Sequence, residues 1–236
     1  MGGVFEGLRE ALSLILQGDP ALTEIVSLSL RVSGIALLLS SLLGVPAGAA
    51  LALTRFTGRR AAIALVYTGM AFPPVVVGLF VYLLLSRSGP LGSLALAWMP
   101  QLFTPAAMIV AQVIIAFPLV AGFTMAAVMG VDPNLRLQVL SLGASRWQTT
   151  WAVLDEARTG VIAAVIAGFG GIISEVGAVM LVGGNIAGRT RVLTTAIVLE
   201  TNKGNFGFAL ALGIILLTIA FVANFAVLRL QGTRFD

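Results

Sequence analysis

Five segments of this chain each contain the roughly 20 consecutive, mostly apolar residues that a helix needs to cross a lipid bilayer. In chain order these segments are Ile25–Leu53, Ala61–Ser86, Pro105–Gly130, Gly160–Gly183 and Phe206–Leu228. Only 10% of the 236 residues are charged, whereas about 25% is usual in soluble domains. Backbone amides and carbonyls cannot stay unpaired in hydrocarbon, so apolar segments of this length fold as helices. The sequence therefore predicts an all-α integral membrane protein with five transmembrane helices.

Residues 1–20 precede the first span and differ from it, because charged residues are interspersed among the apolar ones. A helix here would carry four apolar side chains on one side, namely Phe5, Leu8, Leu12 and Ile15. This pattern predicts an N-terminal interfacial helix that ends at Gly18-Asp19-Pro20. Residues 21–236 are expected to form one transmembrane domain, within which the apolar stretch Leu91–Leu102 is too short to cross the membrane.

Proline and glycine residues mark the points where the spans are expected to break or to approach one another. Pro46, Pro73-Pro74 and Pro118 are expected to interrupt their spans, because proline lacks the N–H that a helix hydrogen bond needs. Such breaks persist in membranes only where neighbouring protein or a water-lined cavity satisfies the freed backbone groups. Gly44 and Gly48 form a GxxxG pattern, which allows a second helix to approach closely.

The basic residues indicate the orientation, since Lys and Arg are enriched in cytoplasmic loops of membrane proteins. With five spans, eight of the 14 basic residues would lie on one side and six on the other. The larger group consists of Arg55, Arg59, Arg60, Arg136, Arg146, Arg158, Arg229 and Arg234. We therefore expect the loop 131–159 and the C-terminus in the cytoplasm and the N-terminus outside. The same bias explains the net charge of +4 without a nucleic-acid partner.

Several kinds of chemistry are excluded by the composition. The chain contains no Cys and no His, which removes disulfides, thiolate nucleophiles, Ser-His-Asp catalysis and the usual zinc and haem ligands. Residues 183–190 nearly match the phosphate-binding pattern GxxxxGK[ST]. However, Arg189 replaces the lysine, and an apolar span precedes the loop where a strand is required. We therefore expect no enzymatic activity, no metal site and no nucleotide site in this chain.

The longest mixed polar segment is Asp132–Gly160, and it carries the signals of two short helices. Asp132 can cap a helix whose first residue is Pro133, and Gly143 can end that helix in the left-handed conformation. Ser145 can cap a second helix. Each helix would carry an apolar stripe, formed by Leu135, Val139 and Leu142 in the first and by Trp147, Trp151 and Leu154 in the second. Apolar side chains on a loop between spans predict an element that docks on another protein.

The run Leu142-Gly143-Ala144-Ser145-Arg146-Trp147 resembles the cytoplasmic loop of ABC importer permeases, in which a Glu-Ala-Ala precedes a glycine. In that family the loop docks into the ATP-hydrolysing subunit and transmits its closure. The resemblance implies that contacts to an ATPase are made by Leu135, Val139, Leu142, Gly143, Ala144, Ser145, Arg146 and Trp147. The chain departs from the pattern at two places, where Leu137-Gln138-Val139 replaces Glu-Ala-Ala and Val153-Leu154-Asp155-Glu156 replaces Ile-x-Leu-Pro.

The fourth span contains a second informative run, Ser174-Glu175-Val176-Gly177-Ala178-Val179, followed by Gly183-Gly184-Asn185-Ile186. It resembles permeases for molybdate, sulfate and tungstate, and is most similar to the tungstate branch, as is the Asp-Glu-Ala-Arg run at 155–158. The candidate residues of the translocation pathway are Ser174, Glu175, Gly183, Gly184 and Asn185. Glu175 has two interpretations: a structural carboxylate that pairs with backbone or a basic residue at a helix break, or a proton relay.

The resemblance implies a type I ABC importer permease in the inner or plasma membrane of a prokaryote. It would act as a homodimer with two cytoplasmic ATPase subunits, which bind ATP and Mg²⁺, and with an extracytoplasmic substrate-binding protein. The residues after Thr190 suggest an amphipathic helix up to Glu200 on the outer side, and this region is either the docking site of the binding protein or a solvated loop. The expected cargo is tungstate, passed along neutral donors that hold a dianion weakly. These donors would include backbone N–H groups exposed at expected helix breaks at Gly168–Gly171 and Gly183–Gly184. Molybdate, sulfate or another solute is an alternative. An ion-driven secondary transporter is a competing class, but it normally shows a repeat and several ionisable groups at mid-membrane.

Overall fold

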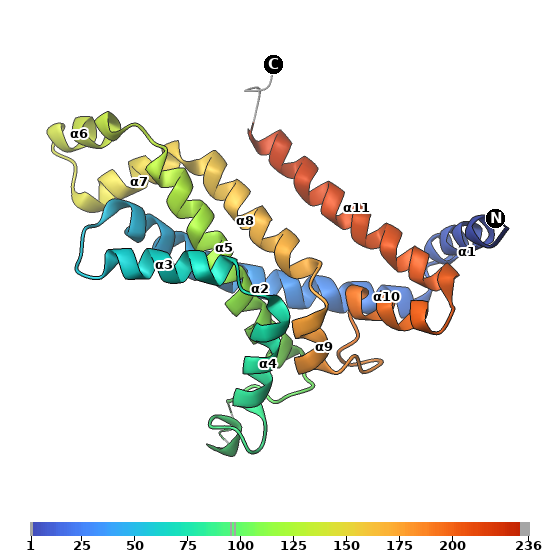
Figure 1. Ribbon diagram of the computed structural model, residues 1–236. Helices are drawn as coiled ribbons and strands as arrows, with labels where there is room; N and C mark the ends of the chain where they lie inside the picture. Colours follow the sequence, from blue (N-terminus) through green and yellow to red (C-terminus); the bar gives the residue numbers. More distant parts are fainter. Residues whose placement is uncertain (1, 95, 97, 232–236) are drawn as a thin grey trace.

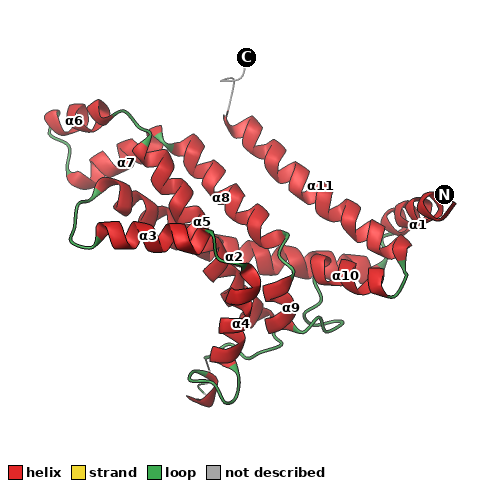
Figure 2. Ribbon diagram, viewed as in Figure 1, coloured by secondary structure: helices red, strands yellow, loops and turns green. Residues whose placement is uncertain are grey.

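The computed structural model describes residues 2–94, 96 and 98–231, and the regular structure in these residues is helical throughout (Figures 1 and 2). The predicted all-α fold is confirmed. The elements in chain order are α1 (Gly2–Gln17), α2 (Pro20–Leu53), α3 (Arg59–Met70), α4 (Pro74–Leu85), the 3-10 turn η1 (Gly92–Leu94), α5 (Pro105–Met129), α6 (Pro133–Ser141), α7 (Arg146–Glu156), α8 (Arg158–Ile173), α9 (Gly177–Gly183), α10 (Leu193–Asn202) and α11 (Phe206–Gln231).

Three helices, α2, α5 and α11, are each long and apolar enough to cross a membrane. The count rises to as many as five if each of two bent pairs, α3 with α4 and α7 with α8, is taken as one span. The predicted first, third and fifth spans are therefore single helices. The first of them begins earlier than predicted, at Pro20, because the Asp19 carboxylate accepts hydrogen bonds from the amides of Ala21 (2.9 Å) and Leu22 (3.0 Å).

The second predicted span, Ala61–Ser86, is not one helix. Its two parts, α3 and α4, meet at an angle of 102°. Pro73 has an extended backbone (φ −61°, ψ 120°) and is followed by Pro74 at the first turn of α4. A proline disfavours the helical conformation in the residue before it, so the helix stops and restarts at this pair. The predicted interruption at Pro73-Pro74 is confirmed.

The other two interruptions were predicted wrongly, because Pro46 and Pro118 lie inside the continuous helices α2 and α5. Membrane helices tolerate an internal proline where neighbouring protein supports the freed backbone. At Pro118 the neighbour is α3, since a Cβ added to Gly69 would lie 2.9 Å from the Pro118 Cβ. α3 packs closely against the proline ring, and α5 continues through Pro118 without the predicted break.

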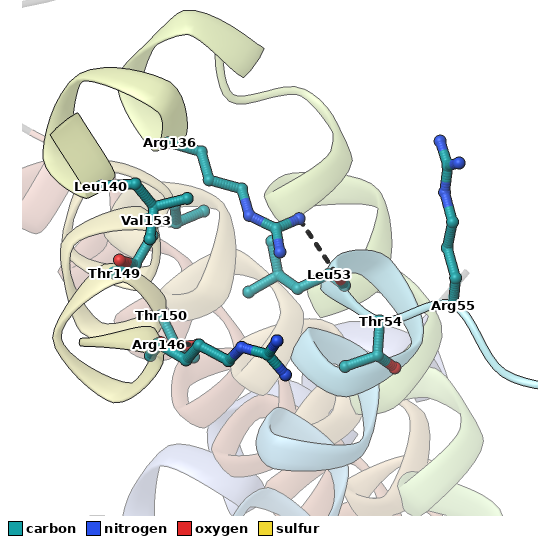
Figure 3. Close-up of a pocket in the computed structure, with 9 residues that line it drawn as sticks. All are labelled: Leu53, Thr54, Arg55, Arg136, Leu140, Arg146, Thr149, Thr150 and Val153. Carbon is teal, nitrogen blue, oxygen red and sulfur yellow. Dashed lines mark hydrogen bonds between the residues drawn. The ribbon is translucent and has the colours of Figure 1, made fainter. Parts of the chain in front are cut away.

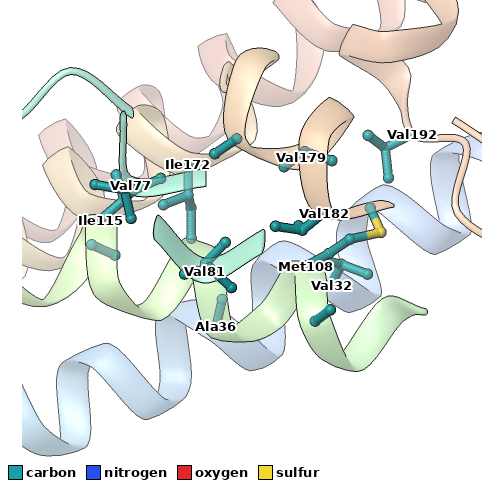
Figure 4. Packing of buried hydrophobic residues seen from close by; sticks show 14 residues of the cluster. Val32, Ala36, Val77, Val81, Met108, Ile115, Ile172, Val179, Val182 and Val192 are labelled. Atoms are coloured by element: carbon teal, nitrogen blue, oxygen red, sulfur yellow. The ribbon is translucent and has the colours of Figure 1, made fainter. Parts of the chain in front are cut away.

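The core of the fold is the crossing of α2 with α5, and the predicted close approach at Gly44 and Gly48 is confirmed. A Cβ on Gly44 would lie 3.0 Å from the Val120 Cβ, and one on Gly48 would lie 2.9 Å from the Thr124 Cβ. The main cluster of buried apolar side chains joins this pair to α4, α8 and α9 (Figure 4). Its labelled members are Val32, Ala36, Val77, Val81, Met108, Ile115, Ile172, Val179, Val182 and Val192.

The fourth predicted span, Gly160–Gly183, is also divided. α8 runs without a break through Gly168 and Gly171, which pack against Val120 and Leu119 of α5. The expectation that the backbone is broken at Gly168–Gly171 is therefore wrong. The break falls at residues 174–176 instead, and the second expected break is confirmed, because α9 ends at Gly183 and Gly184 is left-handed (φ +72°).

The N-terminal helix α1 is amphipathic as predicted and ends at Gly18 (φ +65°). It packs on α11, and its Ala11 belongs to a second cluster with Ala196 of α10 and with Ala211 and Leu212 of α11. Leu8 and Leu12, two of the predicted apolar stripe, remain exposed. The face of α1 that packs on protein is thus a different one from the predicted stripe, although Ile15 belongs to both.

Candidate functional site

The first candidate site is the helix pair α6–α7, which lies at the opposite end of the bundle from α9 and α10 (Figure 1). α6 begins as predicted, with the Asp132 Oδ1 accepting the amide N–H of Asn134 at 2.9 Å. It ends at Ser141, and Gly143, which follows the C-cap Leu142, has a left-handed backbone (φ +85°). The amide of Gly143 donates to the Leu140 carbonyl (3.0 Å) and that of Ala144 to the Val139 carbonyl (3.3 Å). This pair of bonds is the Schellman motif, so Gly143 is required for its conformation.

The second helix of the pair, α7, is capped at its N-terminus by two reciprocal hydrogen bonds. The Ser145 hydroxyl accepts the Gln148 amide (3.3 Å), and the Ser145 amide donates to the Gln148 Oε1 (2.8 Å). This reciprocal arrangement is a capping box. The predicted cap at Ser145 and the predicted helix–glycine–helix order are therefore confirmed.

The exposure of the predicted docking residues separates them into two groups. Leu142 is 87% exposed, whereas Leu135 and Val139 are half-buried against the bundle. Leu137, which the predicted stripe omits, is 64% exposed. The stripe was assigned by spacing alone, and spacing cannot tell which face of α6 is turned toward the bundle. Leu137 and Leu142 are the most exposed apolar side chains of α6 and its end.

The tryptophans of α7 share one face, as predicted. The Trp147 and Trp151 rings meet edge to face with centroids 6.0 Å apart and an interplanar angle of 87°. Together with Leu154 they line an apolar groove of about 540 Å³, whose other wall is formed by α2 and α8. This face of α7 therefore borders the spans, although Trp147 and Trp151 remain 69% and 58% exposed.

The helix pair is anchored to the ends of two spans. Val153 and Ala157 are buried in a cluster with Ala49 of α2 and Val128 of α5. The Arg136 Nη1 of α6 also donates to the carbonyl of Leu53, the last residue of α2, at 3.1 Å (Figure 3). Cations near a helix C-terminus are stabilising, because its last carbonyls have no partner within the helix. No local sequence pattern predicts this bond, since 83 positions separate its partners.

The second candidate site is the break between α8 and α9, where Glu175 is half-buried. Its Oε1 accepts the amide N–H of Ala178 at 2.9 Å, in the first turn of α9. The Glu175 carbonyl accepts the Thr194 hydroxyl at 2.7 Å, which ties the break to α10. The carboxylate thus pairs with backbone at a helix break, which is the structural interpretation of Glu175.

Gln112 is a residue at this break that the sequence reasoning missed. It is buried in α5, and its Nε2 donates to the carbonyl of Ile172 at 3.1 Å, one residue before α8 ends. Its Oε1 is buried without a hydrogen-bond partner among the described residues. Its position in the sequence could have identified it, because a polar amide inside an apolar span is costly unless it has a structural or functional role.

The remaining predicted pathway residues lie on either side of α9. Ser174 is exposed, but its hydroxyl donates to the Gly170 carbonyl at 2.7 Å. The Asn185 Nδ2 donates to the Thr195 carbonyl at 3.4 Å, and Asn185 has a left-handed backbone (φ +50°). Gly183 packs on Met108, and Gly184 packs on Phe103. Ser174, Glu175 and Asn185 are thus near helix ends, and the side chain of each already has an intramolecular hydrogen-bond partner.

The loop 183–191 is closed on itself and does not have the geometry of a phosphate loop. The Thr190 hydroxyl donates to the Gly183 carbonyl (2.6 Å) and accepts the Ile186 amide (3.0 Å). The amides of Arg189, Thr190 and Arg191 all donate to the Ile186 carbonyl. A phosphate loop needs such amides directed at its ligand, so these bonds explain why the near match is accidental.

A charged cluster closes the loop between α10 and α11. Glu200 is buried and accepts hydrogen bonds from Lys203 Nζ (2.8 Å) and Asn205 Nδ2 (3.0 Å). The hydrogen bond from Lys203, outweighing the opposing effect of burial, lowers the pKa of the Glu200 carboxyl below its usual value. The predicted helix after Thr190 is confirmed as α10, and this ionised cluster fixes its C-terminal end.

The chain has the fold of a type I ABC importer permease. This fold combines apolar helices, two of them broken, with a capped helix pair that projects from their ends. A solved structure of a bacterial alginate ABC transporter, in complex with an alginate-bound periplasmic protein, contains a chain of the same fold. The TM-score is 0.72 at 22% identity, with 99% of this chain and 90% of that chain covered. Residues 44–233 match the family described as binding-protein-dependent transport system inner membrane component, and the chain belongs to that family.

Relatives within the family are named as transporters of anions. The probable anion ABC transporter permease of Haloferax volcanii is 44% identical over 88% of this chain and 90% of its own. The tungstate uptake system permease TupB of Peptoclostridium acidaminophilum is 37% identical over 97% and 98%. The molybdenum transport permease ModB of Escherichia coli is more distant, at 29% identity over 78% and 82%. These relatives are permease subunits of transporters and not enzymes.

Proposed function

We propose that this chain is the permease of an ATP-driven importer of tungstate. The observation that carries the proposal is the 37% identity to a tungstate uptake permease over 97% of this chain, against 29% to a molybdenum permease. Two copies of the chain would enclose the pathway, and an extracytoplasmic binding protein would deliver the ion. The relative with 44% identity is named only for anions, so molybdate or sulfate is the competing cargo.

In this proposal α6–α7 docks on a cytoplasmic ATPase subunit that binds ATP and Mg²⁺. The exposed Leu137 and Leu142 are the apolar contacts, and the left-handed Gly143 sets the angle between the helices. The α6–α7 pair could transmit movement of the ATPase to the spans, because the cluster around Val153 and Ala157 joins this pair to the ends of α2 and α5. A docking loop that lacked this packing would move without displacing the spans.

The pathway is proposed to run past the break between α8 and α9. Ser174, Gly183, Gly184 and Asn185 would line this path without a fixed cation. The Ser174 hydroxyl and the Asn185 amide already donate to backbone carbonyls, so they would contact a dianion only weakly and would let it pass without trapping it. Glu175 would hold the first turn of α9 and would not carry protons. A proton-driven mechanism is less well supported, because this carboxylate already accepts a backbone N–H.

Reconstitution tests the cargo. Proteoliposomes with the permease, its ATPase and its binding protein should accumulate tungstate on ATP hydrolysis, and omission of the binding protein should abolish uptake. Replacing it with a docking-competent binding protein for another oxyanion should change the cargo, because a pathway of neutral donors cannot separate ions of equal charge and shape. Uptake that is driven by a proton gradient without ATP would overturn the proposed function. Tungstate selectivity that persists after the exchange would overturn the weak-contact pathway.

A further inference from the structure

A basic cavity of about 610 Å³ lies between the C-terminal end of α2 and the α6–α7 pair (Figure 3). Three arginines line it, Arg55, Arg136 and Arg146, and its lining contains no carboxylate. Like charges gathered around a cavity repel one another unless an anion lies between them. The cavity therefore has the charge of an anion site.

The arginines still have hydrogen-bond donors available. Arg136 uses one N–H on the Leu53 carbonyl, but a guanidinium carries five donors. The side chain of Arg146 has no hydrogen bond or ion pair within the described part of the chain, and it extends from α7 toward Thr54 (Figure 3). Arg55 stands at the opposite edge of the cavity, where its long side chain is exposed.

The basic cavity continues into the apolar groove of α7. The two share Leu53, Thr54 and Thr150 as lining residues. From these residues the groove follows the exposed Ala50 and the rest of the C-terminal third of α2, and Trp147 and Trp151 form its other wall. A charged compartment therefore adjoins a mainly apolar one, whose lining also includes the exposed Asp155–Arg158 ion pair, at the point where a long apolar helix ends.

We propose that this composite site binds one anionic phospholipid, with its phosphate among the arginines and an acyl chain in the groove. The end of a span is the level of the lipid headgroups, where Arg and Trp side chains are favourable. Basic pockets between membrane helices are suited to anionic headgroups. A free oxyanion would need only the basic cavity, so the adjoining apolar groove favours a lipid. The bound lipid would join the end of α2 to α7.

Tryptophan fluorescence can test the proposal in the full-length chain. The chain has three tryptophans, and the one outside the groove, Trp98, is 78% exposed. In a Trp98→Phe variant, only Trp147 and Trp151 contribute to the tryptophan fluorescence. In phosphatidylcholine vesicles, phosphatidylglycerol with brominated acyl chains should quench these tryptophans at lower mole fractions than brominated phosphatidylcholine does. Each of Arg55→Gln and Arg146→Gln should weaken that preference about fivefold, the effect of one basic residue near the headgroups.

Two controls separate a lipid from other occupants. Arg229→Gln removes an equal charge near the end of α11, away from the cavity, and should leave the preference unchanged. Ala50→Phe fills the groove without changing charge and should reduce quenching. Equal quenching by the two lipids, or a preference that survives Arg55→Gln and Arg146→Gln, would overturn the proposal. Relief of quenching by millimolar inorganic phosphate or tungstate would also overturn it, because the cavity would then hold a free oxyanion.

Discussion

At the scale of single residues, the carboxylate of Glu175 shows how an ionisable group can serve a structural purpose inside a membrane protein. A broken span leaves the amides at the start of the next helix without partners. The Glu175 Oε1 accepts one of these amides, that of Ala178, at 2.9 Å. A negative charge is also favourable beside the N-terminus of a helix. The residue therefore stabilises the break that the proposed pathway uses.

This assignment predicts different outcomes for two substitutions of Glu175. Glu175→Gln keeps an oxygen that can accept the Ala178 amide, so most ATP-dependent uptake should remain. Glu175→Ala removes the acceptor and should destabilise the protein by about 1 kcal/mol, as loss of a helix cap does. Uptake in proteoliposomes and thermal unfolding of the purified protein provide the two measurements. A stable Glu175→Gln protein without transport would contradict the structural role.

Gly143 allows a similar paired test of docking. Asn and Asp both tolerate the left-handed conformation better than other side chains do, and no atom lies within 4 Å of the position of an added Cβ. Gly143→Asn should therefore keep transport coupled to ATP hydrolysis. Gly143→Asp has the same shape but places a charge beside the exposed Leu142, so it should uncouple the two. The ratio of tungstate imported to ATP hydrolysed is the measurement, and equal ratios in both variants would argue against apolar docking at this turn.

Local residues were predictable from the sequence, and distant pairs were not. Asp132, Gly143 and Ser145 were identified because caps depend on neighbours within about four positions. The bond from Gln112 to Ile172 joins residues 60 positions apart, and only the packing of α5 on α8 brings them together. The same limit explains Leu137, whose exposure depends on how α6 lies against the bundle.

At the scale of elements, prolines with similar local signals gave different structures. Pro73 and Pro74 follow one another and turn the chain by 102°. Pro118 lies alone in α5 and packs against Gly69, so its helix continues. The sequence therefore predicted which segments are helical, whereas continuity within a segment depended on neighbours that the sequence does not identify.

The crossing of α2 and α5 predicts a contrast between two glycines of one helix. A Cβ on Gly48 would lie 3.0 Å from the Met125 amide nitrogen, whereas one on Gly34 would meet no atom within 4 Å. Gly48→Ala should therefore destabilise the protein by about 1–3 kcal/mol through overpacking. Gly34→Ala should be neutral or slightly stabilising, because alanine favours helix. Melting temperatures of the two purified variants are compared with the wild type, and equal values would contradict the close crossing.

At the scale of the whole molecule, large apolar side chains cover much of the surface. Leu217 and Phe221 of α11 are 71% and 69% exposed, and Leu42 of α2 is 62% exposed. Such surfaces cause aggregation in water but suit lipid or a second copy of the chain. The composition alone predicted this property, because no arrangement of a chain with 58% hydrophobic residues could bury them all.

The orientation in the membrane can be tested with single cysteines, since the native chain has none. Gln138 and Thr201 are both exposed, and they belong to α6 and α10, which lie toward opposite ends of the fold (Figure 1). Gln138→Cys should react with a membrane-impermeant maleimide only after the cells are opened. Thr201→Cys should react in intact spheroplasts. The reverse pattern would place α6–α7 outside and would rule out its contact with a cytoplasmic ATPase.

The anchoring of α2 at both ends has a mechanical consequence. Near its start, the Ser29 hydroxyl accepts the amide N–H of Leu193 in α10 at 2.8 Å, and at its end Leu53 is held by Arg136. Both points lie on one continuous helix of 34 residues, and the part from Ser29 to Leu53 is a strut of about 36 Å at 1.5 Å per residue. We expect α2 to work as a connecting rod that carries displacement from one face of the membrane to the other, while the α3–α4 corner flexes. Spin labels at exposed sites on α2 should keep a constant separation through the ATP cycle, and labels on α3 and α4 should not; a changing distance along α2 would contradict its stiffness.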